Sequence, residues 1–465
     1  MAFLLGVVAV PHVATDGFGA AVWCVVGVGV LALGLWRRSV YALTFIAIGG
    51  GMMGLWRGSM MQTGLSVYED AIGKRIMVSG TLSDDVGMGQ RGDQLLRLNS
   101  ISIDGQDHEG ALWVSTTSSA DIKRGDRVTI SGAASAGFGG FALAVYRAEV
   151  TKLERPEPGD VARQARDWFA DTIRKSVDEP QASLGLGYLL GQRRTLPPEL
   201  DAALVATGLT HIVVASGYNL TILVRFARRL FMKVSKYLAT LSASVMIIGF
   251  MAVTGLSPSM SRAGLIAGLS LAAWYYGRKF HPLVLLPFAA AITVAINPSY
   301  AWGDLGWQLS FAAFAGVLIL APLMQRYFYG NKKPGTLRQI FGETVSATIV
   351  TLPLLAYSFG YVSVVAVLAN MLVLPLVPLA MLLTFMTGIT TLISPLFGSL
   401  VALPTEWLLG YMVAVAQYLA DVPWALFELQ PQLWHVFMGY GAIIAACIYM
   451  QRRTGYKLRD SNIVE

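Results

Sequence analysis

The sequence predicts a polytopic α-helical membrane protein with a small, OB-like β-barrel inserted outside the cytoplasm. Composition is the first observation: 55% of the 465 residues are hydrophobic, 14% are charged, and the mean hydropathy is +0.56. A soluble globular protein has fewer apolar residues. The second observation is their distribution, because apolar segments of spanning length flank one polar stretch that has the pattern of short strands.

The N-terminal part of the chain contains two expected spans. Asp16 to Trp36 and Ser39 to Trp56 each approach the roughly 20 residues that a membrane-crossing helix needs. Arg37 and Arg38 between them indicate a cytoplasmic turn, so the chain that follows should lie outside. Met1 to Val13 is apolar but short and has no basic leader, which favours a half-span or interfacial segment over a signal peptide.

The polar stretch from residue 57 to 160 has the pattern of a small barrel. Turns rich in glycine and aspartate separate short alternating runs, which is typical of an OB-like barrel, although pieces of a β-sandwich would look similar. The expected strands are Arg75 to Leu82, Gln94 to Asp104, Gly110 to Thr116, Asp126 to Gly132 and Phe141 to Val150.

Four aromatic residues of this barrel have two interpretations. Trp113, Phe138, Phe141 and Tyr146 would suit a stacking platform for single-stranded nucleic acid. The charge opposes that interpretation, because residues 57 to 160 carry eleven Lys and Arg against fourteen Asp and Glu. We therefore expect most of these aromatics to be core residues.

The rest of the chain is expected to form a membrane bundle. Val161 to Val177 has the pattern of an amphipathic helix that lies on the membrane or on the bundle. Its expected face consists of Val161, Ala165, Trp168, Phe169, Thr172 and Ile173. The expected apolar segments after it are Leu204 to Leu230, Tyr237 to Gly255, Ala263 to Tyr276, Leu283 to Ile296, Leu309 to Leu323, Val345 to Phe359 and Val362 to Ile393 and beyond.

These segments define the expected domains. They are N-terminal membrane segments over 1–57, the barrel over 58–160, amphipathic helices and a linker over 161–200, a channel-type bundle over 201–453 and a cytoplasmic tail over 454–465.

Basic residues set the expected topology of the bundle. Clusters follow the first, third and fifth apolar segments, and Arg452 and Arg453 favour a cytoplasmic C-terminus. Parity holds only if Val362 to Pro375 enters the membrane and returns. Asn370 and Pro378 suit such a broken element, because non-helical backbone at depth must be buried in protein or line water. We therefore predict a re-entrant or discontinuous segment here.

Ionisable side chains inside apolar segments are functional candidates. Each costs about 2.5–3.5 kcal/mol on insertion scales, so a chain keeps few of them without a role. The candidates are His211, Arg262, Asp304 and, less deeply placed, Glu343 and Glu406.

The stretch "THIVVASGYNLTILVRF" places polar groups in the first apolar segment of the bundle. At ~100° per residue, His211 and Tyr218 share one helix face, with Asn219 beside it, which predicts a face turned toward a wet cavity. Alternatively, His211 and Asn219 make hydrogen bonds between helices, and Ser216-Gly217 permits close packing. We favour the cavity, because "TGLSPSMSRAG" and "WGDLGWQLSF" add polar groups at a similar expected depth.

Other function classes find less support. His211 and Ser216 lie five residues apart, about 140° around one helix, so the base and nucleophile of an intramembrane hydrolase would be poorly placed. The chain has no G-x-x-x-x-G-K-S/T loop for a nucleotide and no histidine-rich cluster. Cys24 and Cys447 indicate neither a disulfide framework nor a metal site. We expect no catalytic residue, no metal and no cofactor.

Four motifs in this order resemble the ComEC competence family, whose members pass one DNA strand across the cytoplasmic membrane in natural transformation. They are "GLTHIVVASGYNLTILV", "SPSMSRAGL", "DLGWQLSFAAFAGV" and "TLPLLAYSFGYVSVVAVLANMLVLPLVPL". The resemblance spans most of the chain. It implies a channel and not an enzyme, with single-stranded DNA, the lipid membrane, an extracytoplasmic DNA receptor and a cytosolic helicase-like motor as partners.

The chain departs from that family in two ways. Many relatives have a histidine where this chain has Asn219, so a role that rests on that histidine does not transfer. Many relatives also continue into a C-terminal metallo-β-lactamase-like domain thought to degrade one strand. This chain stops shortly after its last expected span, so we expect a channel without its own nuclease.

The resemblance also implies roles for the polar residues. Arg262 is the expected phosphate contact, by bidentate pairing, or else it pairs with Asp304 inside the bundle. Arg225, Arg228 and Arg229 would receive the emerging strand at the cytoplasmic mouth, although topology also explains them. A small-molecule or lipid-precursor permease remains the main alternative. The residues expected to line or shape the path are His211, Ser216, Gly217, Asn219, Arg262, Asp304, Gln308 and Asn370.

Overall fold

The chain forms two compact units, and each is described by itself. The computed structural model describes residues 1–10, 17–36, 42–89, 92–103, 105–192, 196–213, 217–255, 257–278, 281–330 and 334–456. The first unit comprises residues 1–161, 255–258 and 287–308. The second comprises residues 162–254, 259–286 and 309–465.

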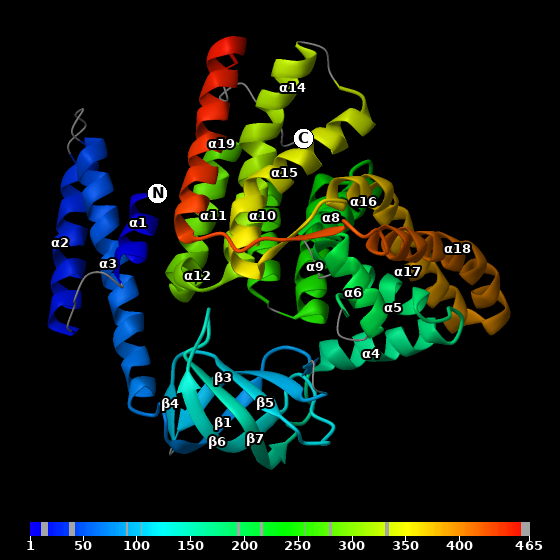
Figure 1. Cartoon of the computed structure of the whole chain (residues 1–465), viewed down its shortest axis with the longest axis horizontal. Helices are drawn as coiled ribbons and strands as arrows, with labels where there is room; N and C mark the ends of the chain where they lie inside the picture. The colour runs from blue at the N-terminus through cyan, green and yellow to red at the C-terminus, as the bar shows by residue number, and fades with distance from the viewer. Residues whose placement is uncertain are drawn as a thin grey trace. The chain divides into compact units, whose positions relative to one another are not determined.

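Three helices open the first unit: α1 (Ala2–Ala9), α2 (Gly17–Trp36) and α3 (Ala42–Glu69) (Figure 1). Glycines let α1 and α3 approach closely, because a Cβ atom on Gly6 would clash with the carbonyl oxygen of Gly51. Helix α3 continues past Trp56, where the apolar pattern ends. It therefore reaches the barrel as one uninterrupted helix.

The barrel has the strands that the sequence predicts, with two short additions. Strand β1 pairs with β3 and β6, β6 with β7, β7 with β5, and β5 with β3, so five strands close a circle. Only β5 and β7 run parallel. This is an OB-like barrel, as predicted. The strands are β1 (Arg75–Leu82), β2 (Gly87–Met88), β3 (Gln94–Ile103), β4 (Gln106–His108), β5 (Leu112–Thr116), β6 (Arg127–Ala136) and β7 (Leu143–Glu154).

Alternate residues of these strands fill the barrel core, as the two-residue period of a strand requires. Val78, Leu98, Val114 and Val128 are buried there. Tyr68, in the last turn of α3, belongs to the same core and donates its hydroxyl proton to the carbonyl oxygen of Glu109 at 3.0 Å. Burial raises the pKa of Tyr68 to about 12. The end of α3 is thus part of the barrel.

A buried carboxylate holds the end of the barrel chain. Arg155 donates from Nε and Nη2 to the two carboxylate oxygens of Asp126, at 3.0 and 2.8 Å. The backbone N–H of Lys123 donates to the same carboxylate at 2.9 Å. Because Asp126 is almost fully buried, these donors replace the water that it loses on folding.

Helices form most of the remaining chain. They are α4 (Val161–Arg174), α5 (Gln181–Leu190), α6 (Pro198–Ala206), α7 (Thr210–Val213), α8 (Gly217–Phe231), α9 (Lys236–Thr254), α10 (Pro258–Tyr275), α11 (Pro282–Ile296), α12 (Ser299–Trp302), α13 (Leu305–Ala315), a π-helix (Gly316–Leu320), α14 (Ala321–Tyr329), α15 (Thr336–Phe359), α16 (Ala366–Val373), a 3₁₀-helix (Leu374–Leu376), α17 (Val377–Ile393), α18 (Pro395–Ala420) and α19 (Leu433–Thr454). A short hairpin pairs β8 (Tyr361–Ser363) with β9 (Leu426–Glu428).

Six helical segments in the described part of the chain are long and apolar enough to cross a membrane. The fold is therefore the predicted one, a polytopic helical protein with an OB-like domain. The six segments are Lys236–Thr254, Leu305–Tyr329, Leu337–Phe359, Ala366–Ile393, Pro395–Ala420 and Leu433–Thr454.

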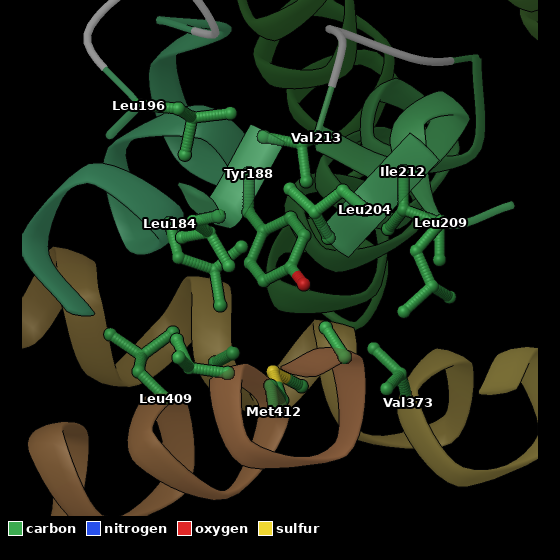
Figure 2. Packing of buried hydrophobic residues seen from close by; sticks show 14 of the residues in the cluster. Leu184, Tyr188, Leu196, Leu204, Leu209, Ile212, Val213, Val373, Leu409 and Met412 are labelled. Atoms are coloured by element: carbon green, nitrogen blue, oxygen red, sulfur yellow. The ribbon is translucent and has the colours of Figure 1, made fainter. Parts of the chain in front are cut away.

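The core of the second unit surrounds Tyr188 of α5. Figure 2 shows its ring between Leu184 and Leu204. Leu409 and Met412 of α18 lie below the ring in this view. All five side chains are almost fully inaccessible. A large apolar cluster thus joins α5, α6 and α18, and it fixes the segment that precedes α7 and α8.

The first apolar segment of the bundle is not one helix, contrary to our expectation. Residues 204 to 230 are divided among α6, α7 and α8. Gly208 has φ +69, a conformation that favours glycine, and a Cβ atom there would approach that of Ala366 to 2.9 Å. A turn within an apolar stretch does not change its hydropathy, so the hydropathy pattern could not predict this break.

The expected apolar face of α4 is buried only in part. Thr172 and Ile173 are buried, whereas Val161 and Trp168 are exposed. Arg163 and Arg166 are buried as well, because the carboxylate of Asp167 lies 3.3 Å from Nη1 of Arg163 and 2.9 Å from Nη2 of Arg166. Contact of the exposed residues with a membrane stays a prediction.

The predicted re-entrant or discontinuous segment near Asn370 is irregular only locally. Val362 lies in β8, α16 follows, and one 3₁₀ turn at 374–376 leads from α16 into α17, so Ala366–Ile393 continues as one helical segment long enough to cross a membrane. Proline lacks the backbone N–H that an α-helix needs in its interior, which accounts for the 3₁₀ turn. Re-entry into a membrane stays a prediction.

Replacing Arg155 with alanine should destabilise the barrel by roughly 1–3 kcal/mol, because the buried Asp126 loses its charged donor. Hydrogen exchange of the β6 and β7 amides in the full-length protein should become faster. Arg75→Ala is the control, since its pair with Glu149 is exposed on both sides and should contribute under about 1 kcal/mol. Equal exchange in the two variants would contradict this account.

Candidate functional site

The candidate site of the second unit begins at the turn between α6 and α7. Thr207 is buried and donates its hydroxyl proton to the carbonyl oxygen of Ala203 at 2.8 Å, so it satisfies its own helix. His211 lies on α7 with an exposed side chain, and its Nδ1 lies 2.9 Å from the carbonyl oxygen of Gly208. A carbonyl only accepts, so Nδ1 carries the proton and Nε2 is the acceptor.

Asn219 lies inside the unit and connects three helices. Its side chain is fully buried, and Nδ2 donates to the carbonyl oxygens of Tyr188, at 3.1 Å, and of Ile212, at 3.3 Å. Tyr188 belongs to α5, Ile212 to α7 and Asn219 to α8. The amide therefore satisfies two backbone acceptors where the chain is broken, which matches the alternative we considered, hydrogen bonding between helices.

Gly217 begins α8 and permits a close approach to α10. A Cβ atom on Gly217 would lie 3.2 Å from that of Ala263. Ala263 directly follows Arg262, so the start of α8 packs beside the arginine that the sequence selects. Ser216 lies outside the described residues.

Arg262 is the largest fully buried side chain of the described residues, with 1% of its surface exposed. Its Cζ atom lies 5.6 Å from the ring centroid of Phe311 on α13, a cation–π contact. A guanidinium this deep keeps its charge, because arginine does not lose its proton in proteins. The interior of the unit thus contains a permanent positive charge.

Asn370 lies on α16 and is also buried. Nδ2 donates to the carbonyl oxygen of Ala366, one turn earlier in the same helix, at 2.8 Å. Ala366 is also the residue that Gly208 approaches. The structure therefore links the turn after α6 to α16, and it brings the surroundings of His211 and Asn370 together.

Asp304 and Gln308 belong to the first unit. Oδ1 of Asp304 accepts a hydrogen bond from the backbone N–H of Trp307 at 2.5 Å, so Asp304 caps the N-terminus of α13. Gln308 donates from Nε2 to the carbonyl oxygen of Ala301 at 3.4 Å. Both residues have structural contacts of their own, and their role in a path stays a prediction.

The three arginines expected at the cytoplasmic mouth lie near the end of α8. Arg225 and Arg229 are exposed, whereas Arg228 is half-buried. Cζ of Arg228 lies 5.0 Å from the ring centroid of Trp274 on α10. This ring contact could not be predicted from the residue pattern, because the two residues lie on different helices.

The four aromatic residues of the barrel lie together on its surface, contrary to our expectation of core positions. Trp113 contacts Phe138 and Tyr146, with ring centroids 5.5 and 5.1 Å apart, and Phe138 contacts Phe141 at 5.4 Å. The exposed fractions are 47% for Phe138 and 49% for Tyr146. Cζ of Arg97 lies 5.2 Å from the Phe141 ring centroid. We call these five residues the aromatic surface.

Metal chemistry finds no support among the residues that the structure describes. They contain no group of three His, Cys, Asp or Glu side chains that could hold an ion. The two cysteines are both free thiols.

Comparison with known proteins matches more than half of the chain to one protein family. The model of the Competence protein family matches residues 188–453. ComE operon protein 3 of Bacillus subtilis (strain 168) is 25% identical over 250 residues, which cover 52% of this chain and 31% of that protein. An uncharacterized protein of Aquifex aeolicus (strain VF5) is 26% identical over 237 residues, which cover 50% of this chain and 52% of the relative. No solved structure matches the chain.

Replacing Asn219 with alanine should destabilise the second unit by about 1–3 kcal/mol, because two buried carbonyl groups lose their donor. Asn219→Asp preserves the size of the side chain but has no amide donor, so it should be at least as harmful. Thermal unfolding in detergent measures both effects. Thr240→Ala is the control, since that hydroxyl only donates to its own helix. A similar melting temperature for all variants would refute this role.

Proposed function

Because the chain belongs to the Competence protein family, the family of ComEC, we propose that it passes single-stranded DNA across the cytoplasmic membrane during natural transformation. The matched parts cover 31% and 52% of the two relatives, so substrate and partners are proposals for this chain. Arg262 is the observation that carries the proposal. A buried arginine within an apolar helix is costly, and a polyanionic substrate gives it a function.

The charge of the surrounding sequence supports an anionic substrate. No Asp or Glu occurs between Asp201 and Asp304, and every charged residue in this interval is basic. A segment of one sign attracts ligands of the opposite sign. The basic residues are Arg225, Arg228, Arg229, Lys233, Lys236, Arg262, Arg278 and Lys279.

The proposed path combines this charge with neutral polar groups. His211 and Asn370 offer hydrogen bonds near the α6–α7 turn, and Gly217 lets α8 approach α10. Asn219 would stabilise the path without lining it, because its buried amide joins α8 to α5 and α7. Ser216, Asp304 and Gln308 remain proposed members of the path.

The direction of transport follows from the proposed sidedness. Basic residues prefer the cytoplasmic side, and Arg452 and Arg453 occupy the last turn of α19. We therefore place the C-terminus and the end of α8 in the cytoplasm, with the barrel outside. An extracytoplasmic DNA receptor would deliver the strand, and a cytosolic helicase-like motor would pull it.

The aromatic surface supports a first contact between strand and barrel. Exposed rings stack on unpaired bases regardless of sequence. Arg97 beside them would exchange part of its ion pair with Asp84, 3.7 Å away, for a phosphate. The net acidity of the whole barrel is less important than this local arrangement, because Arg97 lies directly on the ring of Phe141.

Uptake of labelled DNA tests the channel. Deletion of the gene should abolish strand entry, wild type should restore it, and Arg262→Ala should reduce it by at least about tenfold, the effect of one lost charged contact. Arg262→Lys retains the charge but not the planar pairing, so it should recover only part of the uptake.

Membrane insertion must be equal in all strains, and Arg278→Ala, which changes an exposed arginine that follows α10, provides a control. Unchanged uptake in the deletion strain would reject the DNA channel for that cell. A permease for small molecules or lipid precursors would then become the leading function. Loss of uptake in Arg278→Ala as well would show that any removed cation has the same effect.

Binding of single-stranded DNA by the full-length protein tests the aromatic surface. Tyr146→Ala should weaken binding by about five- to hundredfold, as loss of one stacked base does. Fluorescence anisotropy of a labelled oligonucleotide gives the affinity. Tyr276→Ala removes an exposed ring outside the barrel and should have no effect. Equal affinity of wild type and Tyr146→Ala would reject this contact.

A further inference from the structure

The ends of α8 and α10 and the start of α9 meet around one indole ring. Cζ of Arg228 lies 5.0 Å from the Trp274 ring centroid, and Nζ of Lys236 lies 5.6 Å from it. Lys236 is equally close to the Tyr275 ring, at 5.6 Å. Two cations from different helices therefore share one aromatic ring. We call Arg228, Lys236, Trp274 and Tyr275 the cation–indole site.

This site has an uncompensated positive charge. In the parts of α8, α9 and α10 that the structure describes, no carboxylate exists to pair with Arg228 or Lys236. Among the described residues neither of them forms an ion pair, and Nε of Arg228 is buried without a hydrogen-bond partner. The neighbouring charges of Arg225 and Arg229 add repulsion. An anion would relieve all of these costs at once.

Apolar side chains surround the same cations and identify the class of anion. Exposed residues of this kind lie between the basic positions of α8 and of the α8–α9 turn, and others lie beside them on α9 and α10. A soluble polyanion would leave them in water, whereas a lipid covers them with its acyl chains. These residues are Phe226, Leu230, Val234, Tyr237 and Tyr276.

The aromatic rings also favour a lipid over a nucleic acid. The Trp274 ring already contacts two cations, so a stacked base would compete with Arg228 and Lys236 for it. Tryptophan and tyrosine at the ends of membrane helices lie at the level of the lipid headgroups. Both features agree with a headgroup phosphate beside Arg228 and Lys236.

We propose that the cation–indole site binds the headgroup of an anionic phospholipid. The phosphate accepts hydrogen bonds from Arg228 and Lys236, and the two rings hold these cations in position. The exposed apolar residues of α8 and α9 contact the acyl chains. This site would fix the end of α8 in the membrane interface, and it does not depend on the proposed DNA channel.

Full-length protein in nanodiscs tests the site. Phosphatidylglycerol is added to phosphatidylcholine nanodiscs, and native mass spectrometry counts the lipid that stays bound. Arg228→Gln with Lys236→Gln should lower the apparent affinity by more than about thirtyfold, because the loss of charged hydrogen bonds adds to the effect of two interfacial cations. The matched control is Arg225→Gln with Arg229→Gln, which removes two exposed cations from the same helix. It costs only the general attraction of two interfacial cations, so its loss should be at least about tenfold smaller than that of a site variant that also loses charged hydrogen bonds to the phosphate.

Substitutions of Trp274 provide a second test in the same nanodiscs. W274L preserves the net charge but removes the ring, so it should also weaken binding, whereas W274F should retain most of it. Circular dichroism in phosphatidylcholine alone must show that all variants are folded. Equal losses in the two double variants would reduce the site to general charge attraction and overturn the proposal. So would displacement of the lipid by a single-stranded oligonucleotide or by inorganic phosphate.

Discussion

The second unit depends on the rule that polar groups inside an apolar bundle must find partners within the protein. The backbone N–H and C=O groups of a regular helix bond to one another. This chain breaks its helices between residues 204 and 230, and it has a 3₁₀ turn at 374–376. Asn219 makes the first interruption tolerable, because one amide serves carbonyl groups of α5 and α7. The Thr207 hydroxyl and Nδ2 of Asn370 donate to carbonyl groups of their own helices, whereas the buried Oδ1 of Asn370 has no hydrogen-bond partner among the described residues.

Aromatic rings lie beside three cations of this unit. Phe311 faces Arg262, and Trp274 faces both Arg228 and Lys236. The distinction is physical, because a carboxylate cancels a positive charge whereas a ring stabilises the cation and leaves its charge intact. A protein that must attract anions without holding them permanently benefits from the second arrangement. The absence of Asp and Glu from 202 to 303 in the sequence fits this interpretation.

The predictable features are those with a local cause. The barrel strands follow from a period of two residues and from turn glycines, so β1 agrees with the prediction at both ends. Features that depend on distant residues were missed. The position of Asn219 depends on the Tyr188 carbonyl, 31 residues earlier. The total charge of the barrel hid the aromatic surface, because composition carries no information about where Arg97 lies. For the same reason sequence could select Arg262 but not the ring of Phe311 that it faces.

Helix α3 gives the first unit a mechanical property. Its 28 residues form a rod of about 42 Å, with glycine-packed α1 against one part and Tyr68 locked in the barrel core at the end. The linkage has no hinge, because the same helix that packs on α1 supplies a core residue of the barrel. A force that pulls on the barrel must therefore bend α3 or extract Tyr68, and both are resisted. The barrel is thus attached to its helix as a rigid extension rather than as a tethered domain, and a force on the barrel is transmitted along that rod.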